Sequence, residues 1–179
     1  MNLQLRTMKP IILLLSAIVT GWLYFTNAFE KKAESNLNQK DFDYNFNVKD
    51  LEGRSLAFKE YKDKVVFLNL WATWCGPCRY EMPGIQKLFN SVDSNKIVFV
   101  MLSLDREGDL VKVASYAKNN AFTFPVFMSS GNLTSQLNVP SIPTTFIIDR
   151  KGKIVLQHIG STNYDTDKYR KLLTDLSKD

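Results

Sequence analysis

The sequence has few residues that bind metals: two cysteines and one histidine among 179 residues. An iron–sulfur cluster held by four thiolates is excluded, and so is a catalytic zinc ion held by three histidines, because His158 stands alone. A four-ligand structural zinc site could not easily be assembled within one such chain either. We therefore expect no metal and no organic cofactor. Cys75 and Cys78 are the only residues that can carry out thiol chemistry.

Signals for nucleotides and nucleic acids are missing as well. The sequence has no GxGxxG motif and no phosphate-binding loop, so nucleotide binding has no support. Lys and Arg total 23 against 18 Asp and Glu, a net charge of +5 without the clustering that a nucleic-acid surface needs. The hydrophobic share of 45% excludes a disordered chain, and the length predicts one globular domain plus a further segment.

The further segment lies at the amino terminus, where residues 10–29 carry no charge. A helix of that length spans about 30 Å, the thickness of the hydrocarbon core of a bilayer. Basic residues precede it, which favours an amino terminus in the cytoplasm and a domain outside. We interpret residues 1–30 as a single-pass anchor in the cell membrane. A cleaved signal peptide is the alternative, because Thr26 and Ala28 form a small-x-small pattern.

Residues 31–41 are polar and unpatterned, so we interpret them as a tether to an extracytoplasmic domain formed by residues 42–179. In that domain, short apolar runs alternate with stretches of helical periodicity. Strands are predicted at residues 46–48, 56–58, 65–71, 97–104, 125–128, 144–148 and 154–159. Helices are predicted at residues 77–90, 109–119, 133–137 and 165–177. The alternation predicts an α/β fold with a central mixed sheet flanked by helices on both faces.

The two cysteines lie where a buried strand gives way to a helix, in the segment Trp74-Cys75-Gly76-Pro77-Cys78. Free N–H groups and the dipole at the start of a helix stabilise a thiolate, and can lower a cysteine pKa from about 8.5 to about 7 or below. One helical turn, about 5 Å between Cα atoms, is a distance that a disulfide can span. We predict that Cys75 is the exposed, attacking sulfur and that Cys78, further inside, resolves the mixed disulfide.

Three other uses of such a cysteine pair fit this sequence less well. A structural disulfide that closes so short a loop would stabilise the chain little. Haem attachment requires a histidine directly after the second cysteine, where this sequence has Arg79. A zinc half-site would need two further ligands from a partner. The strand-to-helix position, with a tryptophan before the pair and Pro83 after it, favours thiol–disulfide exchange.

Residues 65–83 (VVFLNLWATWCGPCRYEMP) resemble the active-site segment of thioredoxin-fold proteins, and closely that of membrane-anchored TlpA/ResA-like thiol–disulfide oxidoreductases. The similarity extends from about residue 42 to the end of the chain. It implies a thioredoxin-like fold with an amino-terminal β-hairpin and an inserted helix–strand unit at residues 109–128. It also implies that the Ile142–Pro143 peptide bond is cis and lies beside the cysteines, where the neighbouring backbone holds an extended substrate.

By the same resemblance, the substrate-binding residues are Trp74, Gly76, Pro77, Ile142 and Pro143. Trp74 is the tryptophan expected to line the substrate surface. The Gly76-Pro77 dipeptide is the one that reducing thioredoxins carry, with potentials of about −270 mV, which favours a reductase.

The sequence departs from minimal thioredoxins below the cysteine pair. Those proteins have a buried aspartate there, but six residues before Cys75 this sequence has Asn69, which cannot take up a proton. A carboxylate that assists Cys78 must therefore come from elsewhere. Glu81 matches a glutamate that ResA-like proteins place near the active site, so it is our candidate for proton transfer or for tuning the cysteine pKa. The alternative is a solvated helix glutamate that pairs with a nearby Lys or Arg.

The resemblance implies a membrane-tethered reductase of protein disulfides outside the cytoplasm, which receives electrons from a membrane thiol carrier. We expect a monomer. The implied substrate is the cysteine pair of apocytochrome c before haem attachment, in cytochrome c biogenesis, with sporulation-type or general disulfide repair as the alternative. Two other functions stay open: a thiol oxidase or isomerase on the same fold, and a redox-inert module that binds peptides beside the cis-proline.

Overall fold

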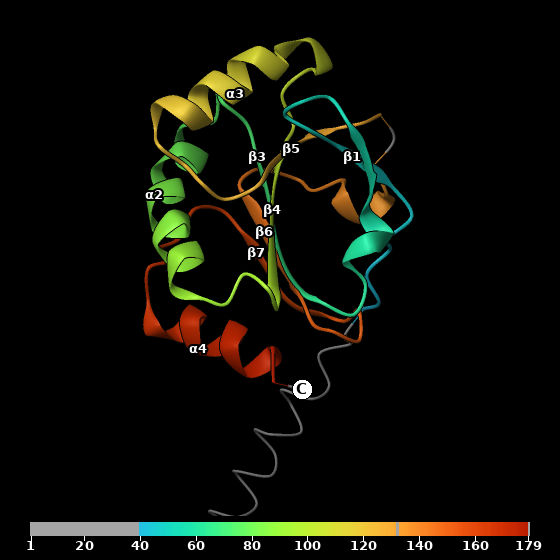
Figure 1. Cartoon of the computed structure of the whole chain (residues 1–179), viewed down its shortest axis with the longest axis vertical. Coiled ribbons are helices and arrows are strands. Elements are labelled where there is room, and N and C mark those ends of the chain that lie inside the picture. The colour runs from blue at the N-terminus through green and yellow to red at the C-terminus, as the bar shows by residue number, and fades with distance from the viewer. Residues whose placement is uncertain (1–39, 132, 179) are drawn as a thin grey trace, which may run out of the picture. The chain divides into compact units, whose positions relative to one another are not determined.

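The computed structural model describes residues 40–131 and 133–178 (Figure 1). These residues form one sheet of seven strands in the order β2-β1-β5-β4-β3-β6-β7. The strands are β1 (Asn47–Asp50), β2 (Ser55–Ala57), β3 (Val65–Trp71), β4 (Ile97–Ser103), β5 (Val126–Ser129), β6 (Thr144–Ile148) and β7 (Ile154–Ile159). The α-helices are α2 (Gly76–Ser91), α3 (Leu110–Asn119) and α4 (Asp167–Leu176), and the 3-10 turns are η1 (Phe58–Tyr61), η2 (Glu107–Asp109) and η3 (Ser135–Leu137).

β3 is the central strand of the sheet. It runs parallel to β4 and antiparallel to β6, so that Leu70 lies opposite both Leu102 and Thr144. β5 pairs in parallel with β4. The β1–β2 hairpin lies at one edge of the sheet, where β1 is antiparallel to β5, and β7 lies at the other edge, antiparallel to β6. The mixed sheet, the amino-terminal hairpin and the inserted unit of α3 and β5 are therefore confirmed.

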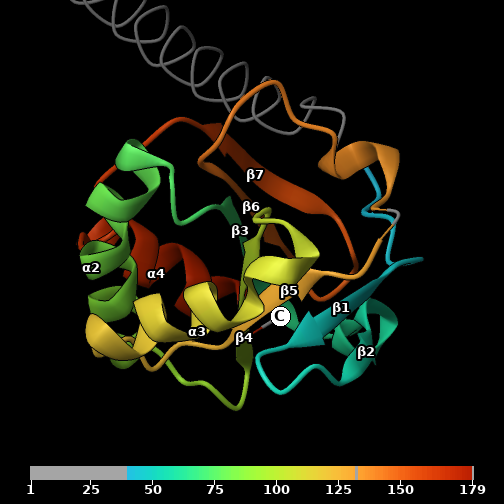
Figure 2. The ribbon, with the colours of Figure 1, turned by 90° about the horizontal axis from the view of Figure 1, so that it is seen from above.

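One face of the sheet carries the three described α-helices. Val65, Phe67 and Trp71 of β3 belong to this face and pack with buried side chains of α2, α3 and α4. The buried apolar positions of α2 are spaced by three and four residues, as in a helix that buries one side: Cys78, Met82, Ile85 and Leu88. Figures 1 and 2 show the three helices together on this side of the strands.

The opposite face has no α-helix among the described residues, which corrects the prediction of helices on both faces. Four aromatic side chains are buried in the apolar cluster on this face: Phe42, Tyr44, Phe46 and Phe58. The rings of Phe46 and Phe58 are stacked, with their centroids 4.3 Å apart. The predicted helix at residues 133–137 is the short turn η3, which adds Leu137 to the same apolar cluster.

The compact unit begins at Lys40, two residues before the predicted domain boundary. The carbonyl oxygen of Lys40 accepts a hydrogen bond from Ile154 N at 3.1 Å, and Asp41 forms an isolated bridge with Lys153. Residues 40 and 41 are thus part of the domain and not of the tether. The predicted anchor or signal peptide, and the rest of the predicted tether, lie outside the described residues. Within the described residues, no helix combines the length and the apolar character needed to cross a membrane.

Candidate active site

Cys75 caps the amino terminus of α2, between the end of β3 and the first helical turn. Its sulfur accepts a hydrogen bond from Cys78 N at 3.2 Å, which satisfies one of the free N–H groups at the start of the helix. Pro77 occupies the first turn, where a missing N–H removes no helical hydrogen bond. The placement predicted from the sequence is therefore confirmed, and it is one in which the helix dipole stabilises a thiolate.

The two cysteines form a disulfide, with 5.3 Å between their Cα atoms, so the structure describes the oxidised form. Cys75 is 5% exposed and Cys78 is completely buried. The prediction that Cys75 presents an exposed sulfur is therefore wrong for this form, although Cys75 is the more accessible of the two. Its sulfur is shielded because it lies only 3.7 Å from the carbonyl oxygen of Ile142.

The Ile142–Pro143 peptide bond is cis, as the resemblance implies. It directly precedes β6, which pairs with β3, so the sheet brings this segment to the end that carries the cysteines. Gly160 N donates a hydrogen bond to the carbonyl oxygen of Pro143 at 2.8 Å, which ties the segment to the end of β7. The fold thus brings Ile142 to Cys75 across a sequence separation of 67 residues.

The two tryptophans near the cysteines have different environments. Trp71 is buried against Tyr116 of α3, as expected of a packing residue. Trp74 is 65% exposed, and Gly76 and Pro77 are exposed as well. These three exposed residues precede Cys75 or separate the two cysteines in the chain, where the resemblance places the contacts with a substrate.

A groove of about 710 Å³ begins at Trp74 and Ile142 and follows the segment that leads into β6. Its apolar walls come from four further side chains: Leu104, Leu133, Leu137 and Val139. None of the described residues that line this groove is charged. A groove of this kind accepts an uncharged, largely apolar segment of chain next to the disulfide.

Glu81 is 3% exposed and lies on α2, one turn after Cys78. Asn69 Nδ2 donates a hydrogen bond to Glu81 Oε1 at 2.8 Å, and Thr162 N donates one to Oε2 at 3.2 Å. Burial raises the pKa of Glu81 to about 7, against the opposing effect of these two hydrogen bonds. The alternative of a solvated glutamate paired with Lys or Arg is therefore wrong. A carboxyl group with this pKa can hold or release a proton near neutral pH.

Asn69 connects Glu81 to the neighbouring strand, because its Nδ2 also donates to Thr145 Oγ1 of β6 at 2.8 Å. Asn69 Oδ1 is buried without a hydrogen-bond partner in the described part of the chain, and the Tyr164 hydroxyl is buried near Thr145 and Glu81. Burial raises the pKa of the Tyr164 hydroxyl, so this group stays protonated at neutral pH. Glu81 is therefore the member of this polar cluster that titrates near neutrality.

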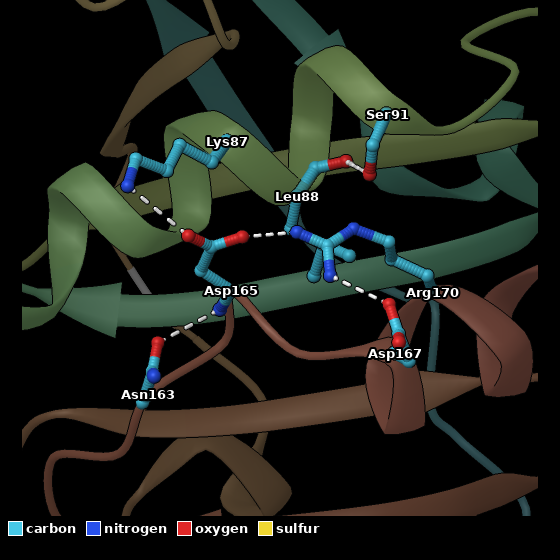
Figure 3. A network of polar contacts seen from close by, with 7 residues as sticks. All are labelled: Lys87, Leu88, Ser91, Asn163, Asp165, Asp167 and Arg170. Carbon is cyan, nitrogen blue, oxygen red and sulfur yellow. Dashed lines mark hydrogen bonds and ion pairs between the residues drawn. The ribbon is translucent and has the colours of Figure 1, made fainter.

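Thr162 lies between β7 and α4, in a segment that polar contacts fasten to both α2 and α4 (Figure 3). Asp165 forms ion pairs with Lys87 of α2, at 3.1 Å, and with Arg170 of α4. Its backbone N–H donates to Asn163 Oδ1 at 2.9 Å. These contacts hold the segment against α2, so that the Thr162 N–H reaches the carboxyl group of Glu81.

Two groups at the site were not predicted from the sequence. Thr162 contributes a backbone N–H, for which the sequence contains no signal. Asp105 lies two residues after the end of β4 and accepts hydrogen bonds from Thr73, which stands two residues before Cys75. A signal for Asp105 did exist, because it stands at the carboxyl end of a strand beside β3, and such ends meet at one edge of a parallel sheet.

No three His, Cys, Asp or Glu side chains gather as a possible metal site within residues 40–131 and 133–178. The expectation that the chain needs no metal and no organic cofactor stays a prediction. The disulfide itself can accept two electrons.

Comparison with known proteins identifies the family. The model of the AhpC/TSA family matches residues 41–157. The chain is 32% identical to the thiol-disulfide oxidoreductase ResA of Bacillus cereus over 168 residues, which are 93% of this chain and 95% of that protein. It is 34% identical to the thioredoxin-like protein YneN of Bacillus subtilis over 156 residues, 87% of this chain and 91% of that protein.

Solved structures agree with this assignment. A thiol:disulfide interchange protein of the thioredoxin family from Chlorobium tepidum has a TM-score of 0.63 and 26% sequence identity. The match covers 75% of this chain and 97% of that one. The chain therefore belongs to the AhpC/TSA family, and it is a thiol-disulfide oxidoreductase with a thioredoxin-like fold.

Proposed function

We propose that this chain reduces protein disulfides outside the cytoplasm, that it is tethered to the membrane, and that apocytochrome c is its substrate. The position of Cys75 carries the proposal. Its sulfur caps α2, 3.2 Å from Cys78 N, and lies beside the Ile142 carbonyl at one end of an uncharged groove. A thiolate at this place is stabilised by the helix, and a disulfide held in the groove can reach it.

The reaction starts from the dithiol form of the pair. The Cys75 thiolate attacks one sulfur of the substrate disulfide, forms a mixed disulfide and releases the other substrate sulfur as a thiolate. Cys78 then loses its proton and attacks Cys75 Sγ, which releases the second substrate sulfur. The substrate has gained two electrons, and the chain is left with the Cys75–Cys78 disulfide. A membrane thiol carrier of the dithiol type returns two electrons and two protons to the pair.

Glu81 is the proposed acceptor for the proton of Cys78. The two side chains are one turn apart on α2, where residues three positions apart are neighbours. Cys78 is completely buried, so bulk water is poorly placed to take its proton. A carboxyl group with a pKa of about 7 is partly ionised at neutral pH and can take up this proton.

Two features support reduction and a protein substrate. Gly76 and Pro77 separate the cysteines, as in reducing thioredoxins with potentials of about −270 mV. The groove of about 710 Å³ can hold several side chains of an extended segment, and its described lining residues carry no charge. An apocytochrome c that presents its cysteine pair in an extended segment before haem attachment would fit this groove.

The reduction potential tests the direction of the reaction. We expect about −270 mV for the full-length chain equilibrated with glutathione or dithiothreitol buffers. A value near about −120 mV would overturn the reductase and support an oxidase. An activity that survives Cys75→Ser would instead show that the chain acts as a redox-inert binding module.

Trapping tests the substrate and the location. Cys78→Ala removes the resolving sulfur, so mixed disulfides through Cys75 should accumulate in cells and be identified by mass spectrometry. Cys75→Ser is the matched control and should trap nothing. An oxidised Cys-x-x-Cys-His peptide should be captured by purified Cys78→Ala, and a failure to capture it would remove apocytochrome c as the substrate. A membrane-impermeant thiol reagent should block Cys75 in intact cells if the domain lies outside.

A further inference from the structure

Asp105 holds both polar groups of Thr73. Its side chain is completely buried, two residues after the end of β4. Oδ2 accepts a hydrogen bond from Thr73 N at 2.7 Å, and Oδ1 accepts one from Thr73 Oγ1 at 2.6 Å. Ser103 Oγ also donates to Oδ2, at 2.8 Å. A buried carboxylate is therefore paired with a residue that stands two positions before Cys75.

The charge of Asp105 strengthens this contact. Burial alone would raise the pKa of the carboxyl group, but the donors of Thr73 and Ser103, together with Lys112 at 3.7 Å, hold it below its ordinary value. Asp105 is thus ionised at neutral pH. Hydrogen bonds to an ionised acceptor are about twice as strong as those between neutral groups.

The contact lies at the base of the loop that delivers the attacking cysteine. Cys75 N donates to the carbonyl oxygen of Ala72 at 3.1 Å, so the loop between β3 and α2 is a tight turn. Trp74 stands between Thr73 and Cys75 and is 65% exposed, so burial of its own side chain does not hold the loop. The Thr73–Asp105 contact fixes the loop one residue before Trp74 and two residues before the sulfur.

Asp105 also stands next to the wall of the groove. Leu104, which precedes it, lines the groove together with Trp74. Leu104 N donates to the carbonyl oxygen of Trp71 at 2.8 Å, which extends the pairing with the last residue of β3 one residue past the end of β4. The carboxylate therefore couples the groove wall to the cysteine loop.

We propose that Asp105 is a positioning residue for thiol–disulfide exchange: through Thr73 it keeps Cys75 at the start of α2 and Trp74 beside the groove. Asp105 acts through Thr73 and has no contact with the reacting sulfurs in the described structure. The inference rests on the proposed function, because disulfide reduction is the reaction whose rate depends on this placement.

Two variants separate the hydrogen bonds from the charge. Asp105→Ala removes both. Asp105→Asn removes the charge, but its oxygen can accept from Thr73 N and Ser103 Oγ while its amide donates to Thr73 Oγ1. We expect Asp105→Ala to lower kcat/KM for insulin reduction about tenfold to a hundredfold, because a displacement of about 1 Å has an effect of this size. Asp105→Asn should stay within about threefold of the unmodified chain.

A control separates positioning from loss of stability. Val48→Ala creates a cavity in the buried face of β1, which belongs to the cluster on the side of the sheet away from α2. It should lower the Tm and leave kcat/KM unchanged. The proposal is overturned if Asp105→Ala keeps its full rate, if Asp105→Asn loses as much as Asp105→Ala, or if Val48→Ala loses as much as Asp105→Ala.

The rate at which iodoacetamide alkylates Cys75 in the reduced chain gives a readout that does not depend on the substrate. Asp105→Ala should react at least threefold more slowly than Asp105→Asn, because both lack the charge and they differ in the hydrogen bonds to Thr73. Equal alkylation rates would overturn the positioning role. A chain that reduces no protein disulfide, but shows the threefold difference, would contradict the proposed function and leave the role of Asp105 supported.

Discussion

Asn69 of β3 donates a hydrogen bond to Glu81 of α2, with 2.8 Å between Nδ2 and Oε1. The strand thus supplies the neutral partner and the helix supplies the carboxyl group. Two carboxyl groups at these positions would face each other at hydrogen-bonding distance, and repulsion between them would raise the pKa of one strongly. The amide of Asn69 instead favours the ionised form of Glu81, while burial opposes it. The balance leaves a pKa of about 7.

The first prediction concerns the pH dependence of stability. The pKa of Glu81 is about 7 in the folded chain and 4.5 as a model value, so the folded state binds this proton more tightly. The free energy of unfolding contributed by Glu81 is therefore highest below about pH 4.5, and it falls as the pH rises through about 7. The fall amounts to about 3 kcal/mol at most.

Glu81→Gln removes this titration. Urea unfolding of the oxidised chain at pH 5 and pH 8 should show a smaller loss of stability for Glu81→Gln than for the unmodified chain. Other groups contribute equally to both proteins, so the difference between the two losses isolates Glu81. Equal losses would contradict a raised pKa at this position.

The second prediction concerns the groove. Val139→Asp places a charge among uncharged lining residues, so it should weaken the binding of an apolar segment. We expect KM for a peptide disulfide with apolar flanking residues to rise about tenfold, within the range that one altered pocket contact produces, with little change in kcat. Steady-state kinetics of peptide reduction measure both constants.

Val111→Asp is the matched control, because Val111 is 75% exposed on α3 and does not line the groove. It should leave KM unchanged. An equal rise in KM for both variants would indicate a general effect of charge, and the groove would then have no specific part in binding. Reduction of the Cys75–Cys78 disulfide by dithiothreitol should be the same in all three proteins.

The third prediction is that the face of the sheet opposite the α-helices contributes to stability and not to the reduction potential. Phe58 is completely buried in the aromatic cluster opposite the α-helices, stacked on Phe46. Phe58→Ala should lower the free energy of unfolding by about 3–5 kcal/mol, as measured by urea unfolding. The reduction potential should not change, because the disulfide packs within the cluster on the other face. A shifted potential would show that the aromatic face also controls the cysteines.

Local sequence was sufficient to predict the redox pair and most of the elements. Cys75 and Cys78 are close enough to form a disulfide, and a helix begins after Cys75; both features depend on neighbours in the chain, and the structure shows both. The apolar run of residues 65–71, interrupted only by Asn69, forms a strand buried on both faces, as predicted. The ends of the helices differ from the prediction by one or two residues. Apolar periodicity does not mark the residue at which a helix begins or ends, because the terminal turns fray.

Contacts between segments that are distant in the sequence determine the environments of the residues at the site. The sequence left two interpretations of Glu81 open, because its burial depends on Asn69, 12 residues earlier, and on Thr162, 81 residues later. The shielding of Cys75 depends on Ile142, and the contact of Thr73 with Asp105 spans 32 residues. A pattern along the chain determines which residues share a helix turn or a strand face. The exposure, pKa and hydrogen-bond partners of a side chain depend on what packs around it, and only the folded structure determines that.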